Sequence, residues 1–281
     1  MPRTDLTSSR PARRRRTVTV DGIELRVSVT SGTSAGPPLL ICNGIGANLE
    51  LLDNFTERLS GIETIVFDAP GIGGSGPPRR PYRMRGLARL AVALLAELGY
   101  DGPVDVLGLS WGGALAQQLA LQYPNVCRRL ILAATSPGAV MVPGKVSTLL
   151  QLINPRRYRD TDHLLRIGSD LYGGTFRRSP ELLARHARHI MPPQGVGYLY
   201  QLLAVWGWTS AVWLRTLRQP TLVMAGNDDP IVPLVNAKLM AAWIRDARLS
   251  VIDDGHLFLV TRPVESAAII RRFLRDGDAE A

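Results

Sequence analysis

The sequence alternates short apolar runs with longer segments of helical periodicity, and this alternation constrains the fold more than any other feature. The apolar runs lie at 38–43, 64–68, 104–109, 129–134, 221–226 and 249–253. The helical patterns lie at 82–98, 110–123, 235–246 and 263–275. Parallel strands that are covered by helices on both faces are apolar throughout their length. The sequence therefore predicts an α/β fold with a mostly parallel, doubly wound sheet.

The N-terminal region concentrates positive charge. Residues 1–16 hold six arginines and one aspartate, and an expected hairpin follows, in which 17–20 and 23–30 flank Asp21 and Gly22. We predict a disordered basic tail over 1–16 and the first part of the core domain over 17–137. Such a tail usually keeps a protein soluble. Attraction to an anionic surface or to nucleic acid is the alternative, but no nucleic-acid motif accompanies the tail, and we expect no nucleic-acid partner.

Residues 138–216 interrupt the alternation of strands and helices. This segment holds eight of the seventeen aromatic residues, three of the four histidines, and ten Lys or Arg against four Asp or Glu. We predict that 138–216 is a helical cap (lid) inserted into the core, which resumes at 217–281. Most of the aromatic side chains are expected to form the cap's own core, and a few to face a substrate cleft beneath it.

A glycine-rich segment, "DAPGIGGSGPP", follows the apolar run at 64–68. Gly71, Gly73 and Gly76 match G-x-G-x-x-G, which in dinucleotide-binding folds opens a helix at a pyrophosphate. Here Pro77 and Pro78 follow at once, and proline has no N–H group to offer at a helix opening. We therefore expect the glycines to form tight turns in a loop near the site, and we expect no nucleotide cofactor.

The segment "VDVLGLSWGGALAQQLALQYP" contains G-x-S-x-G at Gly108, Ser110 and Gly112. An expected strand precedes it and an amphipathic helix follows, which is the context of a nucleophile elbow. In an elbow the serine lies on a strained turn, and the small flanking residues let the two backbones pass closely. A glycine-softened helix start capped by Ser110 is the alternative. We predict that Ser110 is a catalytic nucleophile.

A serine nucleophile needs a general base, and histidine is the usual one. His256 follows the last expected strand in "VIDDGHLFLV", at the edge of the sheet where sites form in open α/β folds. The other three histidines, His163, His186 and His189, lie among arginines in the expected cap, where surface positions are the simpler interpretation. We predict that His256 is the base.

The base needs an acid to orient it, and this acid should follow the preceding strand in "LVMAGNDDPIVP". Hydrolases with this layout often show G-x-x-D-x-x-x-P, and the spacing from Gly226 to Pro233 places Asp229 at the aspartate. We predict Asp229 as the acid and Asp228 as a turn residue. Asp253 and Asp254 are weaker alternatives, because they lie on the same strand-to-loop segment as His256. Turn and loop capping would explain both of them.

An oxyanion hole needs backbone N–H groups at the site where negative charge develops. One donor follows the nucleophile, which makes it the amide of Trp111. The other is expected in "CNGIGANLEL", where Gly44 and Gly46 permit a sharp turn and Ile45 donates its N–H. We predict that Asn43 supports this loop through side-chain hydrogen bonds, although a plain turn residue is the alternative.

Several features of the sequence limit the classes of protein to which the chain can belong. No apolar run approaches the ~18–20 residues of a membrane span, and the N-terminus has no apolar core of a signal sequence. We therefore expect a cytoplasmic protein without a transmembrane segment. The two cysteines, Cys42 and Cys127, lie in or beside expected core elements and are expected to be reduced thiols.

Beyond these motifs, the chain resembles the intracellular medium-chain-length poly(3-hydroxyalkanoate) depolymerases, which have the alpha/beta-hydrolase fold. The resemblance runs from about 17 to 275 and is carried by "NGIGANLEL", "DAPGIGGSGPPRRPYR", "SWGGALAQQLA", "GAVMVPGK", "PRRY", "YGGTFRR", "GWTS" and "DDGHLFLVTR". It implies a Ser110–Asp229–His256 triad that cleaves a polyester through an acyl-enzyme, with no metal or organic cofactor. It also implies a location at cytoplasmic polyester granules, where the basic cap would face the granule surface.

Other functions remain open at the level of sequence. A general carboxylesterase or lipase of the same fold, acting on small or medium-chain acyl esters, is the main alternative. A haloperoxidase-like activity without cofactor would share the triad, whereas a dehalogenase would carry aspartate at position 110. A non-catalytic granule-binding protein would tend to lose members of the triad, and here all three residue types are present.

Overall fold

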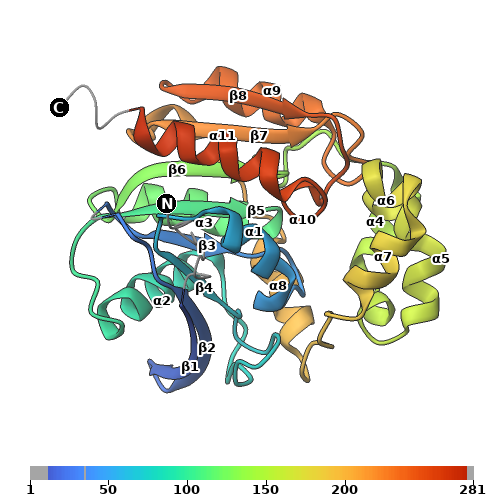
Figure 1. Ribbon diagram of the computed structural model, residues 1–281, viewed down its shortest axis with the longest axis horizontal. Coiled ribbons are helices and arrows are strands. Elements are labelled where there is room, and N and C mark those ends of the chain that lie inside the picture. Colours follow the sequence, from blue (N-terminus) through green and yellow to red (C-terminus); the bar gives the residue numbers. More distant parts are fainter. Residues whose placement is uncertain (1–11, 35, 277–281) are drawn as a thin grey trace, which may run out of the picture.

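A single mixed sheet organises the molecule in the computed structural model, which describes residues 12–34 and 36–276 (Figure 1). The eight strands lie in the order β1-β2-β4-β3-β5-β6-β7-β8. Strand β2 is antiparallel to both β1 and β4, and the remaining neighbours are parallel. The strands are β1 (Arg13–Val20), β2 (Ile23–Thr30), β3 (Leu39–Cys42), β4 (Thr64–Phe67), β5 (Val104–Leu109), β6 (Cys127–Ala133), β7 (Thr221–Gly226) and β8 (Ala247–Ile252).

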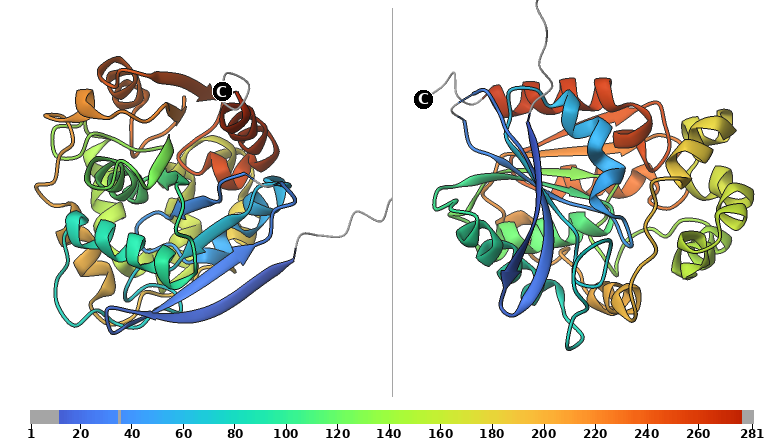
Figure 2. Two further views of the ribbon diagram at one scale, coloured as in Figure 1. Left: turned by 90° about the vertical axis from the view of Figure 1, so that its left-hand side faces the viewer. Right: turned by 60° about the horizontal axis from the view of Figure 1, so that its bottom comes forward.

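Helices cover both faces of this sheet, which explains the continuous apolar strands. Every residue of β3, β4, β5 and β7 is buried. Helices α2 (Met84–Glu97), α3 (Trp111–Gln122) and α9 (Leu234–Trp243) share one apolar core with one face of the sheet. The short α1 (Asp53–Arg58), α10 (Phe258–Thr261) and α11 (Pro263–Arg275) pack on the opposite face (Figure 2). The predicted doubly wound α/β fold is confirmed.

The first strand begins earlier than the sequence indicated. Strand β1 starts at Arg13 and pairs along its whole length with β2, so the predicted tail over 1–16 extends too far. Charge pairing across sequence-distant elements accounts for the difference. The Arg13 guanidinium lies 3.0 Å from Asp53, and that of Arg15 lies 3.6 Å from Glu50. These ion pairs reduce the repulsion between neighbouring arginines, so the arginine run can form a strand. Residues 1–11, the rest of the predicted tail, lie outside the described residues.

The chain between β6 and β7 forms a separate helical layer, called here the insertion (138–216). It contains α4 (Val146–Ile153), η2 (Pro155–Tyr158), α5 (Thr161–Tyr172), α6 (Gly174–Arg178), α7 (Pro180–Ala187), α8 (Gly197–Val205) and η3 (Leu214–Thr216). Leu164, Leu171, Phe176 and Leu183 form a small core of their own within it. Helices α4 to α7 lie beyond the end of the sheet, and α8 lies lower, beside the core domain (Figure 1).

The glycine-rich loop after β4 packs against the insertion. Gly71 and Gly73 have φ values of 77° and 53°, which favour glycine. The Gln194 amide donates to the Gly71 carbonyl at 2.9 Å, and the Gln194 side chain donates to the Gly73 carbonyl at 2.8 Å. A Cβ on Gly71 would lie 2.7 Å from the Cα of Gly197, at the start of α8. The glycines thus allow turns and a close backbone contact, and α2 begins only at Met84.

Two further expectations concern cysteines and membrane spans. Cys42 and Cys127 are buried free thiols, and burial raises the pKa of Cys42 to about 12, so its thiol stays protonated near neutral pH. Over residues 12–34 and 36–276, the helices are all too short or too polar to cross a membrane.

Candidate active site

Ser110 lies on a strained turn between β5 and α3. Its backbone has φ 54° and ψ −118°, a conformation that costs energy for any residue with a Cβ. Three hydrogen bonds hold the turn. The Ser110 amide donates to the Ala133 carbonyl at 2.8 Å, and the Ser110 carbonyl accepts from the Gly113 amide at 2.8 Å and the Thr135 hydroxyl at 2.7 Å. The turn therefore projects the serine side chain at the carboxyl end of β5, as a nucleophile elbow does.

The glycines around Ser110 are required by close packing. A Cβ on Gly108 would lie 2.4 Å from the Gly112 carbonyl oxygen, because β5 and α3 almost touch at the turn. A Cβ on Gly112 would lie 2.1 Å from the Cys42 carbonyl oxygen, at the end of β3. Both positions exclude any side chain, and this is the physical reason for the G-x-S-x-G spacing.

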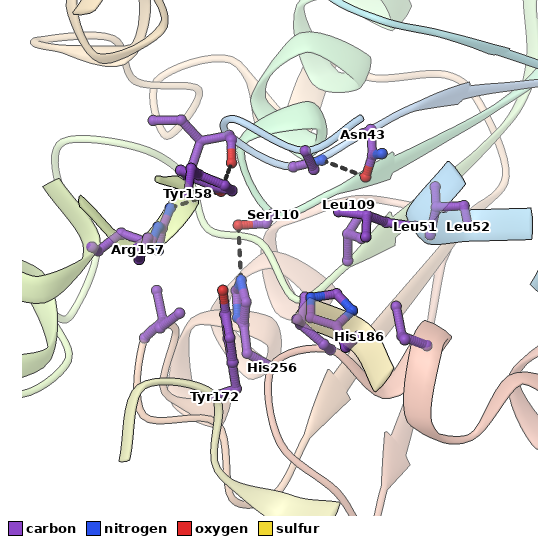
Figure 3. Close-up of a pocket in the computed structure, with 17 residues that line it drawn as sticks. Asn43, Leu51, Leu52, Leu109, Ser110, Arg157, Tyr158, Tyr172, His186 and His256 are labelled. Carbon is purple, nitrogen blue, oxygen red and sulfur yellow. Dashed lines mark hydrogen bonds between the residues drawn. The ribbon is translucent and has the colours of Figure 1, made fainter. Parts of the chain in front are cut away.

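The structure brings Ser110, His256 and Asp229 together in one hydrogen-bonded triad. Figure 3 shows the contact between Ser110 and His256. His256 Nε2 lies 2.9 Å from Ser110 Oγ, and His256 Nδ1 lies 2.7 Å from Asp229 Oδ2. The other carboxylate oxygen of Asp229 accepts hydrogen bonds from the amides of Ile231 and Val232, each at 2.9 Å. All three side chains leave loops at the carboxyl ends of strands β5, β7 and β8, and Asp229 and His256 are both buried.

The competing aspartates make other contacts. Asp228 accepts from the Gly174 amide at 2.8 Å and pairs with Arg177 at 2.7 Å, so it holds the insertion. Burial acts to raise the pKa of Asp228, but these two partners outweigh burial and lower it. Asp254 is buried and accepts from both the amide and the hydroxyl of Thr175, at 2.6 and 2.7 Å. Both aspartates thus bind the start of α6 to the loops that follow β7 and β8.

Asp253, the last of the alternatives, accepts a hydrogen bond from the side chain of Asn227 at 2.8 Å. This contact joins the loop after β7 to the loop after β8. Of the four aspartates that were candidates for the acid, Asp229 is the one whose carboxylate is hydrogen-bonded to His256.

The histidines of the insertion do not behave alike, and the expected surface position of His186 is wrong. Its ring is 7% exposed and lies against Tyr172 and Phe176, with ring centroids 6.1 and 5.2 Å away. Burial, with a smaller effect of His189, lowers the pKa of His186 to about 4, so the ring is neutral at physiological pH. His189 is exposed and His163 is partly exposed.

The proposed oxyanion donors, Ile45 and Trp111, lie at the loop after β3 and at the first residue of α3. Over the described parts of the chain, neither backbone amide donates to a protein acceptor, which leaves both N–H groups available. Asn43 braces this loop, because its side-chain NH₂ donates to the Asn48 carbonyl at 3.0 Å and its oxygen accepts from the Gly44 amide at 2.8 Å.

Two residues of the insertion also hold the Ile45 loop, and no pattern in the sequence predicts either contact. The Tyr158 hydroxyl donates to the Ile45 carbonyl. The Gln201 side chain accepts from the Gly46 amide at 2.7 Å, and the Gln201 carbonyl accepts from the Trp111 indole at 2.8 Å. The insertion therefore fixes both segments that carry the expected oxyanion donors.

A narrow cleft lies beside Ser110 and His256, between the core domain and the insertion (Figure 3). Its wall is mostly apolar, with side chains from both parts of the chain: Ile45, Leu51, Leu52, Leu109, Leu152, Tyr158, Tyr172, Ile231, Leu257 and Val260. Arg157 and His186 add polar groups. Within residues 12–34 and 36–276, the His, Cys, Asp and Glu side chains form no group of three or more that could hold a metal ion.

Comparison with known proteins identifies the family. Residues 37–263 match the model of the alpha/beta hydrolase fold. The chain belongs to this hydrolase family. Within the family, it is 52% identical over 261 residues to a poly(3-hydroxyalkanoate) depolymerase of Ectopseudomonas oleovorans, which covers 92% of each chain. The resemblance stated from the sequence motifs is thereby confirmed.

More distant hydrolases share the fold. A pimeloyl-[acyl-carrier protein] methyl ester esterase of Aromatoleum aromaticum is 30% identical over 85% of this chain and 98% of its own. The solved structure of a hydrolase from Pseudomonas aeruginosa PA01 superimposes with a TM-score of 0.79 at 26% identity, covering 93% of this chain and 98% of that one. Relatives with different activities therefore share one fold, and the substrate of this hydrolase has to be inferred from its cleft.

Proposed function

We propose that the protein hydrolyses ester bonds of medium-chain-length poly(3-hydroxyalkanoate) through an acyl-enzyme on Ser110. The observation that carries the proposal is the hydrogen-bonded Ser110–His256–Asp229 triad, found in a chain that is 52% identical to a poly(3-hydroxyalkanoate) depolymerase. The apolar cleft fits the chemistry of the substrate, because this polyester is uncharged along its chain and carries alkyl side chains.

The reaction starts with acylation. His256 Nε2 accepts the Ser110 proton while Oγ forms a bond to the ester carbonyl carbon, and Asp229 holds the imidazole with Nδ1–H directed at its carboxylate. The amides of Ile45 and Trp111 donate to the oxyanion, and each such donor is worth about 2.7–4 kcal/mol. The ester C–O bond then breaks, and His256 gives its proton to the departing hydroxyl. Water attacks the acyl-enzyme by the same steps and frees Ser110.

The insertion acts as a cap in this proposal. Tyr158 and Tyr172 are buried and line the cleft, so they contact the acyl chain, while most other aromatic residues of the insertion pack elsewhere. Because Tyr158 and Gln201 also hold the Ile45 loop, the cap positions an oxyanion donor as well as the substrate. The catalytic core in this division of the chain comprises residues 13–34, 36–137 and 217–276.

Helix α4 offers a surface for docking onto polyester granules, which we propose as the location of the enzyme in the cytoplasm. Val146, Leu150 and Ile153 are spaced along one side of the helix and are 72%, 59% and 50% exposed. Leu152 of the same helix lines the cleft. Lys145, the residue before the first turn of α4, is exposed and adds a positive charge at one end of this apolar face. Docking through α4 would bring the cleft close to the polymer.

The catalytic proposal is tested with an aqueous suspension of medium-chain-length polymer. We expect wild type to clear the suspension and Ser110→Ala to leave it turbid, with both proteins equally folded by circular dichroism. If wild type cleaves p-nitrophenyl octanoate but leaves the polymer intact, the result would contradict the proposed depolymerase activity. It would favour a general carboxylesterase instead.

The docking proposal is tested by sedimentation with washed granules. The double variant Val146→Ser, Leu150→Ser should bind at least about tenfold more weakly, because each buried side chain contributes roughly 1.5–3 kcal/mol. Val264→Ser, at an exposed position of α11, is the matched control and should bind as wild type does. Equal binding of the double variant and wild type would contradict docking through α4.

A further inference from the structure

Arg157 is a buried cation in the wall of the catalytic cleft. It belongs to η2 of the insertion, and its side chain is 2% exposed. Its Nε and Nη1 atoms are buried and have no hydrogen-bond partner among the described residues. A guanidinium stays protonated in proteins, and a buried charge without compensation is costly. A contribution to the stability of the fold therefore does not explain why Arg157 is buried at this position.

The contacts of Arg157 do not neutralise its charge. Nη2 donates to the hydroxyls of Tyr158 at 3.0 Å and Tyr198 at 3.1 Å, and the guanidinium carbon lies 4.6 Å from the centre of the Tyr158 ring. These hydroxyls donate onward to the carbonyls of Ile45 and Leu152, so both phenols are neutral. Over residues 12–34 and 36–276, no carboxylate pairs with Arg157.

The same side chain lines the cleft in which a substrate would lie. Arg157 lines the cleft together with Ser110 and His256, and Figure 3 shows it across the cleft from the leucines of the core domain. No Asp or Glu is among the described residues that line this cleft, and His186, which lines the same cleft, is neutral. An anionic ligand group would thus meet a single positive charge in an apolar setting, where the attraction is strong.

We propose that Arg157 binds a carboxylate, namely the terminal carboxylate of a polyester chain or of a short oligomer. The inference rests on the proposed function. The N–H groups of Nη1 have no protein partner and can donate to a carboxylate oxygen, and the permanent positive charge of the guanidinium attracts the anion. Because protein encloses Nε and Nη1, the carboxylate displaces a side-chain contact as it enters.

This binding mode assigns the direction of cleavage. The carboxylate at Arg157 belongs to the part of the substrate that leaves as an alcohol. The acyl part forms its bond to Ser110 Oγ, the ester C–O bond breaks, and His256 transfers the serine proton to the departing hydroxyl. The first product is then a hydroxy acid or a short oligomer from the carboxyl end of the chain. Arg157 is a specificity-determining residue in this scheme and takes no part in proton transfer.

The test compares two soluble substrates that differ only in charge: the ester dimer of 3-hydroxyoctanoic acid and its terminal carboxamide. Wild type should show the higher kcat/KM for the free acid. In Arg157→Gln, the ratio of the two kcat/KM values should fall about 10- to 100-fold, because hydrogen bonds to charged groups are worth about 1.5–3 kcal/mol. Arg157→Lys keeps the charge and should retain part of the ratio.

Controls separate recognition of the carboxylate from a structural role. Arg159→Gln, an exposed neighbour, should keep the wild-type ratio. Inhibition of p-nitrophenyl octanoate hydrolysis by 3-hydroxyoctanoate should weaken in Arg157→Gln to the same degree. If Arg157→Gln lowers both kcat/KM values equally and leaves the inhibition unchanged, Arg157 only positions Tyr158 and the proposal is overturned. Wild type that cleaves the dimers but not the polymer would contradict the proposed function while the ratio still tests Arg157.

Discussion

Replacement of His186 by leucine should remove part of the sensitivity of the fold to acid. His186 is buried between Tyr172 and Phe176, and burial, with a smaller contribution from His189, lowers its pKa from 6.5 to about 4. Leucine is close to histidine in volume and has no titratable group, so it can occupy this apolar site uncharged. The variant leaves the row of Ser110, His256 and Asp229 intact.

The size of the effect follows from the difference between two pKa values. In the unfolded chain the imidazole takes up a proton near pH 6.5, whereas in the folded protein it does so only near pH 4. Between these values the unfolded state binds more protons, so the free energy of unfolding falls as the pH falls. A difference of about 2.5 pKa units corresponds to about 3 kcal/mol at most.

The assay is urea denaturation of wild type and His186→Leu at several pH values from 7 to 4, followed by tryptophan fluorescence and circular dichroism. The free energy of unfolding of wild type, relative to the variant, should drop by about 3 kcal/mol across this range. Most of the drop should lie below pH 6.5. His163→Gln, at a partly exposed histidine, is the control and should follow wild type.

Parallel curves for wild type and His186→Leu would refute this reasoning. They would mean that the imidazole gains a proton in the folded protein as readily as in the unfolded chain. The ring would then be solvated, and the cleft beside it would be more open than the structure shows.

Further predictions concern the elbow, the acid and the cap. Asp229→Asn should lower kcat for p-nitrophenyl octanoate by about 10⁴ without unfolding, whereas Asp228→Asn should keep most of the activity. Gly112→Ala should lose about 3 kcal/mol or more in urea denaturation, or fail to fold, because its Cβ would lie 2.1 Å from a carbonyl oxygen of β3. Tyr158→Phe should cost about 1–3 kcal/mol of stability, since a buried carbonyl loses its donor, and kcat should fall because the oxyanion loop loosens. Unchanged kcat in Tyr158→Phe would show that the loop holds its shape without the cap.

The core of the fold could be predicted because its physical cause is local in the sequence. Strand β5 is apolar over its whole length, since helices cover both of its faces, and the glycines beside Ser110 reflect a turn in which no side chain fits. Asp229 and His256 lie in loops that follow β7 and β8. The apolar runs at 221–226 and 249–253 indicate these two strands in the sequence. Chain order and strand ends therefore sufficed to predict which serine, aspartate and histidine lie together.

Features that depend on distant partners were not predictable in the same way. The arginines at the start of β1 look like a solvated charge run until Asp53 and Glu50 are placed beside them. His186 looks like a surface residue among arginines until the fold places it against Tyr172. In each case the sequence shows the side chain but not the neighbour that determines its role.

The contacts of the insertion with the site belong to the same class. Gln201 lies 155 residues from Gly46, and Tyr158 lies 113 residues from Ile45, yet both hold the loop of an expected oxyanion donor. No spacing rule links such pairs. The orphaned nitrogens of Arg157 likewise appear only when every neighbour is known.

The most direct test of the central claim is the mass of the enzyme during turnover. Wild type mixed with medium-chain-length polymer, quenched in acid within milliseconds and digested, should yield the peptide of Ser110 carrying an ester-linked chain of one or more 3-hydroxyacyl units. The Ser110→Ala protein should carry no such group and should release no hydroxy acid. Release of hydroxy acids by Ser110→Ala at the wild-type rate would contradict the account, because ester cleavage would then not pass through Ser110.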